Sequence, residues 1–158
     1  MTSRLSAILM MLLLLAALAP SLAAQAPRFH LGPHLSYNFD AKVIGIGPQL
    51  SIPVASHLEF YPSFEYFFVN SGSLWGLNAD LKYRLPAGKW SWVYLGGGPN
   101  LTRSSIANIS HTDSHLGLLA GFESRHGRVH PYAEFRALVG HGSTSQVAVG
   151  LNFTLRHR

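Results

Sequence analysis

The sequence predicts an all-β protein, an eight-stranded antiparallel up-and-down barrel, from three observations. Eight consecutive segments alternate apolar and polar residues with the period of two that a β-strand imposes on its side chains. Aromatic residues stand near both ends of the apolar side of several segments, and nine of the fifteen glycines lie on the polar side. An even number of antiparallel strands can close into a barrel, which leaves no sheet edge exposed.

The N-terminal residues predict a cleaved signal peptide. Arg4 precedes an apolar run over residues 5–18, and small residues follow it. This pattern is typical of a secretory signal and is too short for a membrane-spanning helix, so we expect cleavage after Ala23 or Ala24. The chain is therefore expected to consist of a signal peptide, 1–24, and one barrel domain, 25–158.

Composition excludes several classes of function. The chain carries twelve Lys and Arg against seven Asp and Glu, a formal net charge of +5, and no cysteine. The basic residues are scattered through the segments instead of clustering, which argues against a nucleic-acid partner and leaves anionic lipid headgroups as the expected one. Without cysteine the chain can form no disulfide and can carry no thiol chemistry.

Residues 73–86 show the alternation most clearly. Six residues of one parity, from Trp75 to Leu85, are apolar, whereas the five between them include Asp80, Lys82 and Arg84. About ten residues at roughly 3.3 Å each, tilted by about 40°, span the ~25 Å apolar band of a membrane. The other seven segments follow the same rule: 29–39, 43–54, 57–69, 90–101, 114–124, 128–138 and 145–156.

The connections between these segments alternate in length. Short ones are expected at 53–56, 86–89 and 125–127, and the others include a long loop from 102 to 113 and a Gly/Ser-rich turn at 140–144. In membrane barrels the short turns face the periplasm and the long loops face outward. Both termini are therefore expected on the periplasmic side.

Glycine indicates which face is the interior. A soluble lipocalin-like barrel has an apolar interior for a lipid ligand, whereas a membrane barrel is apolar outside. An eight-stranded interior is just wide enough to be filled by side chains, so charged residues there need small neighbours, and the glycines stand on the polar side. We therefore predict a transmembrane β-barrel with a filled lumen and no open pore. The expected lumen network is Glu59, Glu65, Asp80, Lys82, Arg84, Glu123, Glu134 and Arg136.

Rings on the apolar side predict an aromatic girdle, because amphipathic rings settle at the two membrane interfaces. Pairing the third and fourth strands so that residue numbers sum to 143, around a loop at 70–73, would stack such rings at both interfaces. In this register Glu59 faces Arg84 and Tyr61 faces Lys82. The expected girdle residues are Tyr37, Phe39, Phe60, Phe68, Trp75, Tyr83 and Phe153.

Five prolines lie inside the predicted strands, all on the apolar side. Proline cannot donate to a strand ladder, so each is expected to mark a bulge or a missing bond. Four are expected near the membrane interfaces, and Pro48 is expected to distort the second strand locally. The five are Pro33, Pro48, Pro62, Pro99 and Pro131.

The mature chain resembles the small outer-membrane β-barrel proteins of the OmpA/OmpX type. The resemblance includes the HLEFYPSFEYFF and WVYLGGGPNL strands, the latter with its Tyr94-x-Gly96-x-Gly98 spacing. At the C-terminus, Gly150, Phe153 and Leu155 match the insertion signal of such barrels, although Arg156, His157 and Arg158 replace the usual terminal aromatic residue. The resemblance implies a monomer in the outer membrane of a Gram-negative-type bacterium. It further implies lipopolysaccharide and the assembly machinery as partners, and a structural, adhesive or envelope-stress role.

An enzymatic reading is the first alternative and a soluble lipid-binding barrel the second. His141 and Ser143 weakly resemble the His-x-Ser of barrel-embedded lipid A deacylases, in which the serine is the nucleophile and the histidine its base. No Asp or Glu follows Ser143 to orient the histidine, so turn residues are the simpler interpretation and we expect no enzyme.

A zinc site is also conceivable from the sequence. His111, Asp113 and His115 lie in or beside the expected long loop and could bind Zn²⁺ together with His141. Their spacing suits a helix, and the segment is expected to be a loop that runs into a strand. Solvated loop histidines are therefore the preferred interpretation, and we expect no metal and no cofactor.

Overall fold

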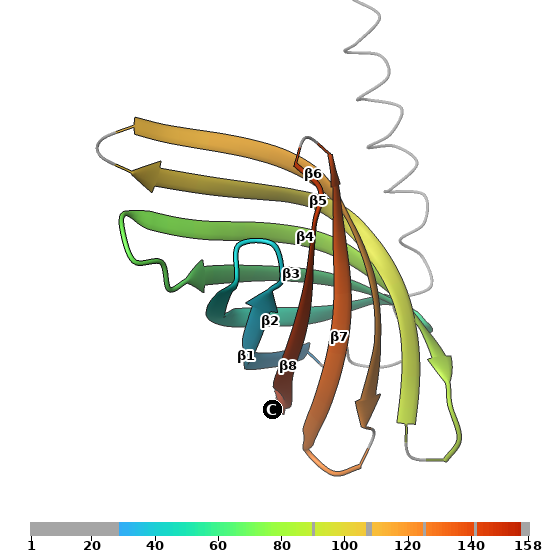
Figure 1. Ribbon diagram of the computed structural model, residues 1–158. Coiled ribbons are helices and arrows are strands. Elements are labelled where there is room, and N and C mark those ends of the chain that lie inside the picture. The colour runs from blue at the N-terminus through green and yellow to red at the C-terminus, as the bar shows by residue number, and fades with distance from the viewer. Residues whose placement is uncertain (1–28, 90, 107–108, 125, 141, 156–158) are drawn as a thin grey trace, which may run out of the picture.

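A computed structural model describes residues 29–89, 91–106, 109–124, 126–140 and 142–155. They form a closed barrel in which every strand lies antiparallel to its two neighbours in chain order, and the first strand pairs with the last (Figure 1). The predicted eight strands and up-and-down order are thereby confirmed, whereas the predicted signal peptide lies outside the described residues. The strands are β1 (Phe29–Asn38), β2 (Val43–Ala55), β3 (Leu58–Phe67), β4 (Ser73–Pro86), β5 (Ser91–Ile106), β6 (Ile109–Ser124), β7 (Val129–Gly140) and β8 (Thr144–Leu155).

The barrel has two distinct ends. We call the end where β1 starts and β8 finishes the terminal end; there Phe29 pairs with Leu155. The opposite end, which carries the β1–β2, β3–β4, β5–β6 and β7–β8 connections, is the loop end. Among the described residues, no helix is long and apolar enough to cross a bilayer.

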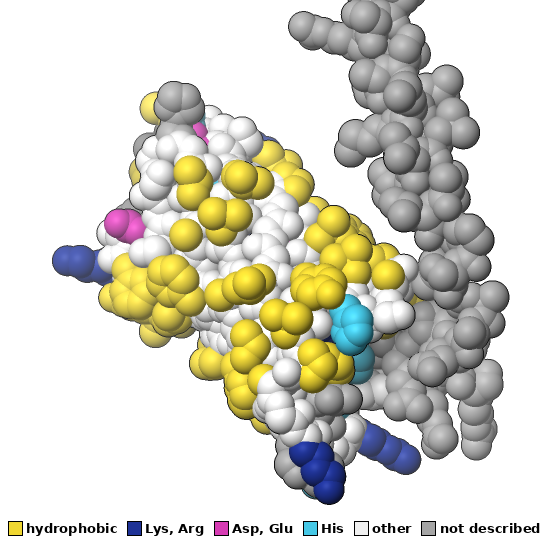
Figure 2. Space-filling model, turned by 90° about the vertical axis from the view of Figure 1, so that its right-hand side faces the viewer, with side chains coloured by type: hydrophobic (Ala, Val, Ile, Leu, Met, Phe, Trp, Pro, Cys, Tyr) yellow, Lys and Arg dark blue, Asp and Glu magenta, His cyan; other side chains and the backbone are white. Residues whose placement is uncertain are grey.

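Side chains alternate between a polar interior and an apolar exterior. Along β1, His34 and Ser36 are buried, whereas Leu31 and Leu35 are exposed. Exposed Leu, Ile, Val or Phe side chains occur on every strand except β3, whose exposed large hydrophobic residue is Tyr66, and Figure 2 shows hydrophobic side chains spread over one face of the molecule. A soluble ligand-binding barrel would have the opposite distribution, with its apolar side chains inside.

The prediction of a long loop at 102–113 is wrong. Most of these residues belong to β5 and β6, which pair in one register from Ser91↔Ser124 to Ile106↔Ile109. The β6–β7 ladder begins only at His115↔Gly140, so residues 109–114 project beyond the end of β7 (Figure 1). Apolar alternation is a requirement only within the membrane, and paired strands can continue beyond it with polar residues on both faces.

The predicted register of β3 and β4 is also wrong. The ladder joins Leu58 to Tyr83 and Glu59 to Lys82, which is two residues away from the predicted pairing of Glu59 with Arg84. Trp75 consequently faces Tyr66 instead of Phe68. The connection covers residues 68–72 and ends at Gly72, whose φ of 83° lies in the left-handed region that glycine adopts without strain.

Four of the five strand prolines coincide with gaps in a ladder that do not shift the register, and for Pro62 and Pro99 the gaps lie in the β2–β3 and β4–β5 ladders. Pro33 and Pro48 face each other in the β1–β2 ladder. On its other side, β1 skips residues 32–33 in the ladder with β8, and β2 skips residues 47–48 in the ladder with β3. Among the described residues, the register of β2 shifts only between Pro53 and Ala55, so the disruption expected at Pro48 takes the form of a missing pair with β3 and not of a bulge.

Candidate functional site

The middle of the lumen holds a compact group of charges. Lys82 Nζ lies 2.9 Å from Glu134 Oε2. Arg136 Nη2 lies 3.0 Å from Glu134 Oε1 and 2.8 Å from Asp80 Oδ2. All four side chains are buried, and Asp80 is completely inaccessible. Buried charges are tolerated when each has an opposite charge and hydrogen bonds, and here two carboxylates face two cations.

Three tyrosines surround Lys82 in the same layer. Its ammonium nitrogen lies 3.1 Å from the ring centre of Tyr61, 4.1 Å from that of Tyr94 and 5.4 Å from that of Tyr132. Ring faces attract a cation, and the attraction strengthens where water is excluded. The predicted lumen network did not include these tyrosines, although the predicted register placed Tyr61 opposite Lys82. Their signal in the sequence is a large ring on the polar parity of a strand, where small residues otherwise predominate.

Glycines leave the space that these rings occupy. A Cβ atom added to Gly121 would lie 2.4 Å from the Tyr94 ring, and one added to Gly150 would lie 2.5 Å from the Tyr132 ring. Both distances are far below van der Waals contact. Gly121 and Gly150 therefore stand where the tyrosine rings of neighbouring strands must fit.

A second charged group lies towards the terminal end. The Arg84 guanidinium pairs with Glu59 and lies 3.0 Å from Glu123 Oε2. Ser51 donates to the Glu59 carboxylate at 2.6 Å, and Asn152 donates to Glu123 at 3.1 Å. Arg84 thus reaches Glu59 across the ladder diagonally, although Lys82 is the residue directly opposite Glu59.

Neutral side chains connect the two charged groups. Asn152 accepts a 2.7 Å hydrogen bond from Gln49, whose Oε1 accepts from the hydroxyls of Tyr61 and Tyr132. Within the described part of the chain, no ion pair joins the Arg84 group to the Lys82 group. Glu59, Lys82, Arg84 and Glu134 therefore lie in two ion-paired groups that a hydrogen-bonded layer links.

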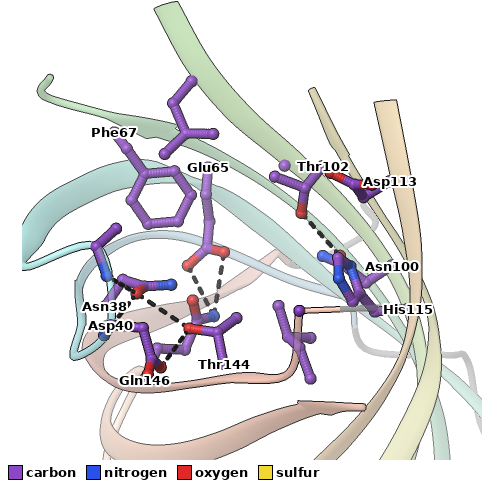
Figure 3. A pocket seen from close by; sticks show the side chains of 15 residues that line it. Asn38, Asp40, Glu65, Phe67, Asn100, Thr102, Asp113, His115, Thr144 and Gln146 are labelled. Atoms are coloured by element: carbon purple, nitrogen blue, oxygen red, sulfur yellow. Dashed lines mark hydrogen bonds between the residues drawn. The ribbon is translucent and has the colours of Figure 1, made fainter. Parts of the chain in front are cut away.

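At the loop end the last lumen carboxylate, Glu65, has neutral or weakly basic neighbours. His34 Nε2 lies 3.2 Å from Glu65 Oε1, and the Gln146 amide donates to both carboxylate oxygens at 3.2 and 3.4 Å. Glu65 and Gln146 line a cavity of about 260 Å³, together with Asn38, Asn100 and His115 (Figure 3). The barrel is therefore packed at its middle and hollow at its loop end.

Asp40 ties the β1–β2 turn to the start of β8. Its Oδ2 accepts 2.7 Å and 2.9 Å hydrogen bonds from the Thr144 hydroxyl and the Ser145 backbone N–H. These two bonds, the hydroxyl first, lower the pKa of the Asp40 carboxyl below its ordinary value, because they favour the ionised form. Thr144 Oγ1 also lies 3.1 Å from Asn38 Oδ1, at the edge of the cavity.

The predicted girdle residues lie on the outside of the barrel in two groups. At the loop end, Tyr37 packs edge-on against Phe39 at 5.4 Å, and Phe68 against Tyr66 at 6.0 Å. Trp75 lies 6.2 Å from Phe64 at the same end. The second group lies towards the terminal end of the barrel and consists of Phe60, Tyr83 and Phe153.

The weak enzymatic and metal candidates are not assembled into a site. Ser143 donates to the Gly140 carbonyl at 3.3 Å as a turn residue, and His141 lies outside the described residues. His111 pairs with Asp113 at 2.9 Å on the projecting hairpin, and His115 lies 3.3 Å from Asn100. Within the described ranges, no three His, Asp or Glu side chains converge in a way that could hold a metal ion.

Apolar exterior, polar ion-paired interior and eight antiparallel strands together define the fold of the small outer-membrane β-barrels. The N-terminal β-barrel domain of Pseudomonas aeruginosa OprF superimposes with a TM-score of 0.66 at 13% identity, over 81% of this chain and 97% of that domain. Neisserial surface protein A gives 0.61 at 15% identity, over 82% and 96%. Ail of Yersinia pestis gives 0.59 at 13%, over 82% and 97%.

No protein-family model matches the sequence, and no curated protein matches it. The similarity therefore lies in the three-dimensional structure and concerns the fold.

Proposed function

We propose that this protein is an integral outer-membrane barrel of a Gram-negative-type bacterium, with a filled polar lumen and no open pore. One observation carries the proposal: apolar side chains cover the outside of the barrel, whereas Lys82, Glu134 and Arg136 are buried and paired at its centre. Such an exterior is unstable in water and matches the hydrocarbon of a bilayer. A charge-paired layer across the lumen leaves no continuous path for water.

Lipid and lipopolysaccharide are the proposed surroundings of the barrel, and the outer-membrane assembly machinery is its proposed partner during insertion. Phe153 and Leu155 are exposed on the outside of β8, where an insertion signal would be accessible to that machinery. Export would use the signal peptide expected at 1–24. Because closure leaves no unpaired strand in the membrane, the proposed state is a monomer.

The proposed role is structural or adhesive, including service under envelope stress. Its support is the projecting β5–β6 hairpin, on which Ile106 and Ile109 are 59% and 76% exposed. Exposed apolar residues beyond the membrane favour contact with another molecule. The structurally similar Yersinia pestis protein is itself named an attachment invasion locus protein.

An enzyme is not proposed. Ser143 is exposed and engaged with the carbonyl of its own turn, which favours a turn residue over a nucleophile. If the protein were a lipid A hydrolase, Ser143→Ala would abolish the change in the lipid A mass spectrum that expression of the wild type causes. We expect no such change from either protein.

The proposal is tested by refolding residues 25–158 into lipid vesicles. A closed barrel resists dodecyl sulfate until it is heated, so the unheated sample should migrate faster than the boiled one, and the refolded protein should float with the vesicles. Recovery of a soluble, monomeric protein without detergent would overturn the proposal.

A further inference from the structure

The cavity at the loop end is lined by carboxylates, uncharged polar side chains, His115 and apolar groups. Asp40, Glu65 and Asp113 contribute carboxylates from three different connections or strands, and Phe67 and Leu138 contribute apolar surface. Glu65 stands two residues inside the end of β3, whereas Asp40 lies in the β1–β2 turn. No Lys or Arg is among the lining residues that the structure describes, although the chain as a whole carries a net charge of +5.

The charges inside the barrel do not balance, and the imbalance falls at this cavity. Five lumen carboxylates accompany three lumen cations. Four of the carboxylates contact Lys82, Arg84 or Arg136. Glu65, which is 3% exposed, contacts only His34 and Gln146 among the described side chains, and Arg136 interacts with it only at longer range. A buried carboxylate without a strong cation favours the uptake of positive charge.

Gln146 supplies an independent sign of a ligand site. Its Nε2 donates to Glu65, but its Oε1 is buried and has no hydrogen-bond partner. Reversing the amide would turn Oε1 towards the Glu65 carboxylate, where two acceptors would repel, so the orientation is determined by Glu65. Gln146 is 2% exposed and is one of the side chains that line the cavity (Figure 3), so an acceptor without a donor lies in the cavity wall.

We propose that the loop-end cavity binds a small organic ammonium ion. An ammonium group is a positive charge with up to three N–H donors and no acceptor, which complements Glu65 and the unpaired oxygen of Gln146. The carbon chain of the ligand would pack on Phe67 and Leu138, and an aromatic ring also attracts an ammonium group. A second ammonium group would meet Asp40 or Asp113 nearer the rim. A metal ion fits less well, because no three ligating side chains converge within the described residues.

The test uses putrescine, a diammonium ion, with the barrel refolded in a neutral detergent and labelled with ¹⁵N. Titration should shift the side-chain amide signals of Gln146 and Asn100 saturably. The neutral isostere 1,4-butanediol should leave them unchanged. Glu65→Gln and Gln146→Met should each weaken binding by about tenfold or more, because each removes a buried partner of the ammonium group.

Glu59→Gln is the matched control, because it removes a lumen carboxylate at the terminal end while Arg84 keeps Glu123. Its affinity for putrescine should equal that of the wild type. Heat-modifiable mobility establishes that each variant is folded. If Glu65→Gln does not refold, the putrescine affinities of Gln146→Met and Asp113→Asn test the proposal instead. Absence of saturable shifts would overturn the proposal. Equal affinity in the folded variants, or equal competition by Mg²⁺, would overturn it as well.

Discussion

The middle of the lumen and its loop end both contain buried carboxylates, but these carboxylates have different partners. At the middle, Lys82 and Arg136 meet Glu134 and Asp80, and tyrosine rings fill the remaining space. At the loop end, Glu65 meets an amide and a histidine beside a cavity. A layer with matched charges can close and stabilise a barrel, whereas a layer with unmatched carboxylates is suited to accept a ligand.

The largest expected effect comes from removing a carboxylate in the matched layer. Glu134→Gln leaves the Lys82 ammonium buried with no carboxylate partner among the described ion pairs, and should lower the free energy of unfolding by about 3–5 kcal/mol. Glu65→Gln is the same substitution where no Lys or Arg loses its partner, and should cost about 1 kcal/mol or less. Urea unfolding in lipid vesicles, followed by tryptophan fluorescence, measures both.

A double variant sharpens this prediction. Lys82→Met combined with Glu134→Gln removes both charges, so it should recover part of the stability that Glu134→Gln loses. Equal losses for Glu134→Gln and Glu65→Gln would contradict the distinction between the two layers.

Glycines offer a comparison of packing in the same two layers. Gly121→Ala would place a methyl group 2.4 Å from the Tyr94 ring and should cost about 1–3 kcal/mol through overpacking. Gly76 lines the cavity, and a Cβ atom there would meet nothing closer than 3.8 Å. Gly76→Ala should therefore change stability by about 0.5 kcal/mol or less. Matching losses in chemical denaturation would show that the loop end is as tightly packed as the middle.

The smallest expected effect is the acid sensitivity of the Asp40 contact. The pKa of Asp40 is lower in the folded protein than in the unfolded chain, because Thr144 and Ser145 donate to its carboxylate. Its stabilising contribution is complete above the ordinary pKa of Asp, about 3.9, and is lost as the pH falls through the lower folded value.

Asp40→Asn should therefore flatten the decline of the urea midpoint at acid pH. The wild type and the variant are compared between about pH 6 and pH 2, and the difference between them isolates Asp40 from the other carboxylates. Parallel curves for the two proteins would show that the contact with β8 contributes nothing.

The sequence was sufficient for the strands and their faces, because alternation with a period of two depends only on neighbouring residues. It was insufficient for the β3–β4 register. Registers in which the paired residue numbers sum to 141 or to 143 both place apolar residues opposite apolar residues. The observed register has the sum of 141, with a connection at residues 68–72. Residues 102–113 were predicted to be a loop because their apolar alternation fails, yet strands that project from a membrane need no apolar face.

The alternation along the strands predicted which charged residues face the lumen, but it did not predict their ion-pair partners. Arg84 reaches Glu59 diagonally and Glu123 from a neighbouring strand, and such contacts depend on register and side-chain length. The cavity was missed because Gln146 and Asn100 are uncharged polar residues, which parity places inside without indicating a role. The sequence did show an excess of lumen carboxylates, five against three cations. This count alone does not identify Glu65 as the carboxylate without a Lys or Arg contact, because that requires the side-chain contacts in the structure.

The central claim is that the charged and aromatic layer closes the lumen, and electrical recording tests it most directly. The refolded wild-type barrel is inserted into a planar lipid bilayer at a salt concentration near 1 M, with a sixteen-stranded porin as the conducting reference. If Lys82, Glu134, Arg136 and the three tyrosines fill the lumen as proposed, they leave ions no path, and the account predicts no conductance above that of the bare bilayer. Stable, uniform conductance steps from the folded wild-type protein would contradict it.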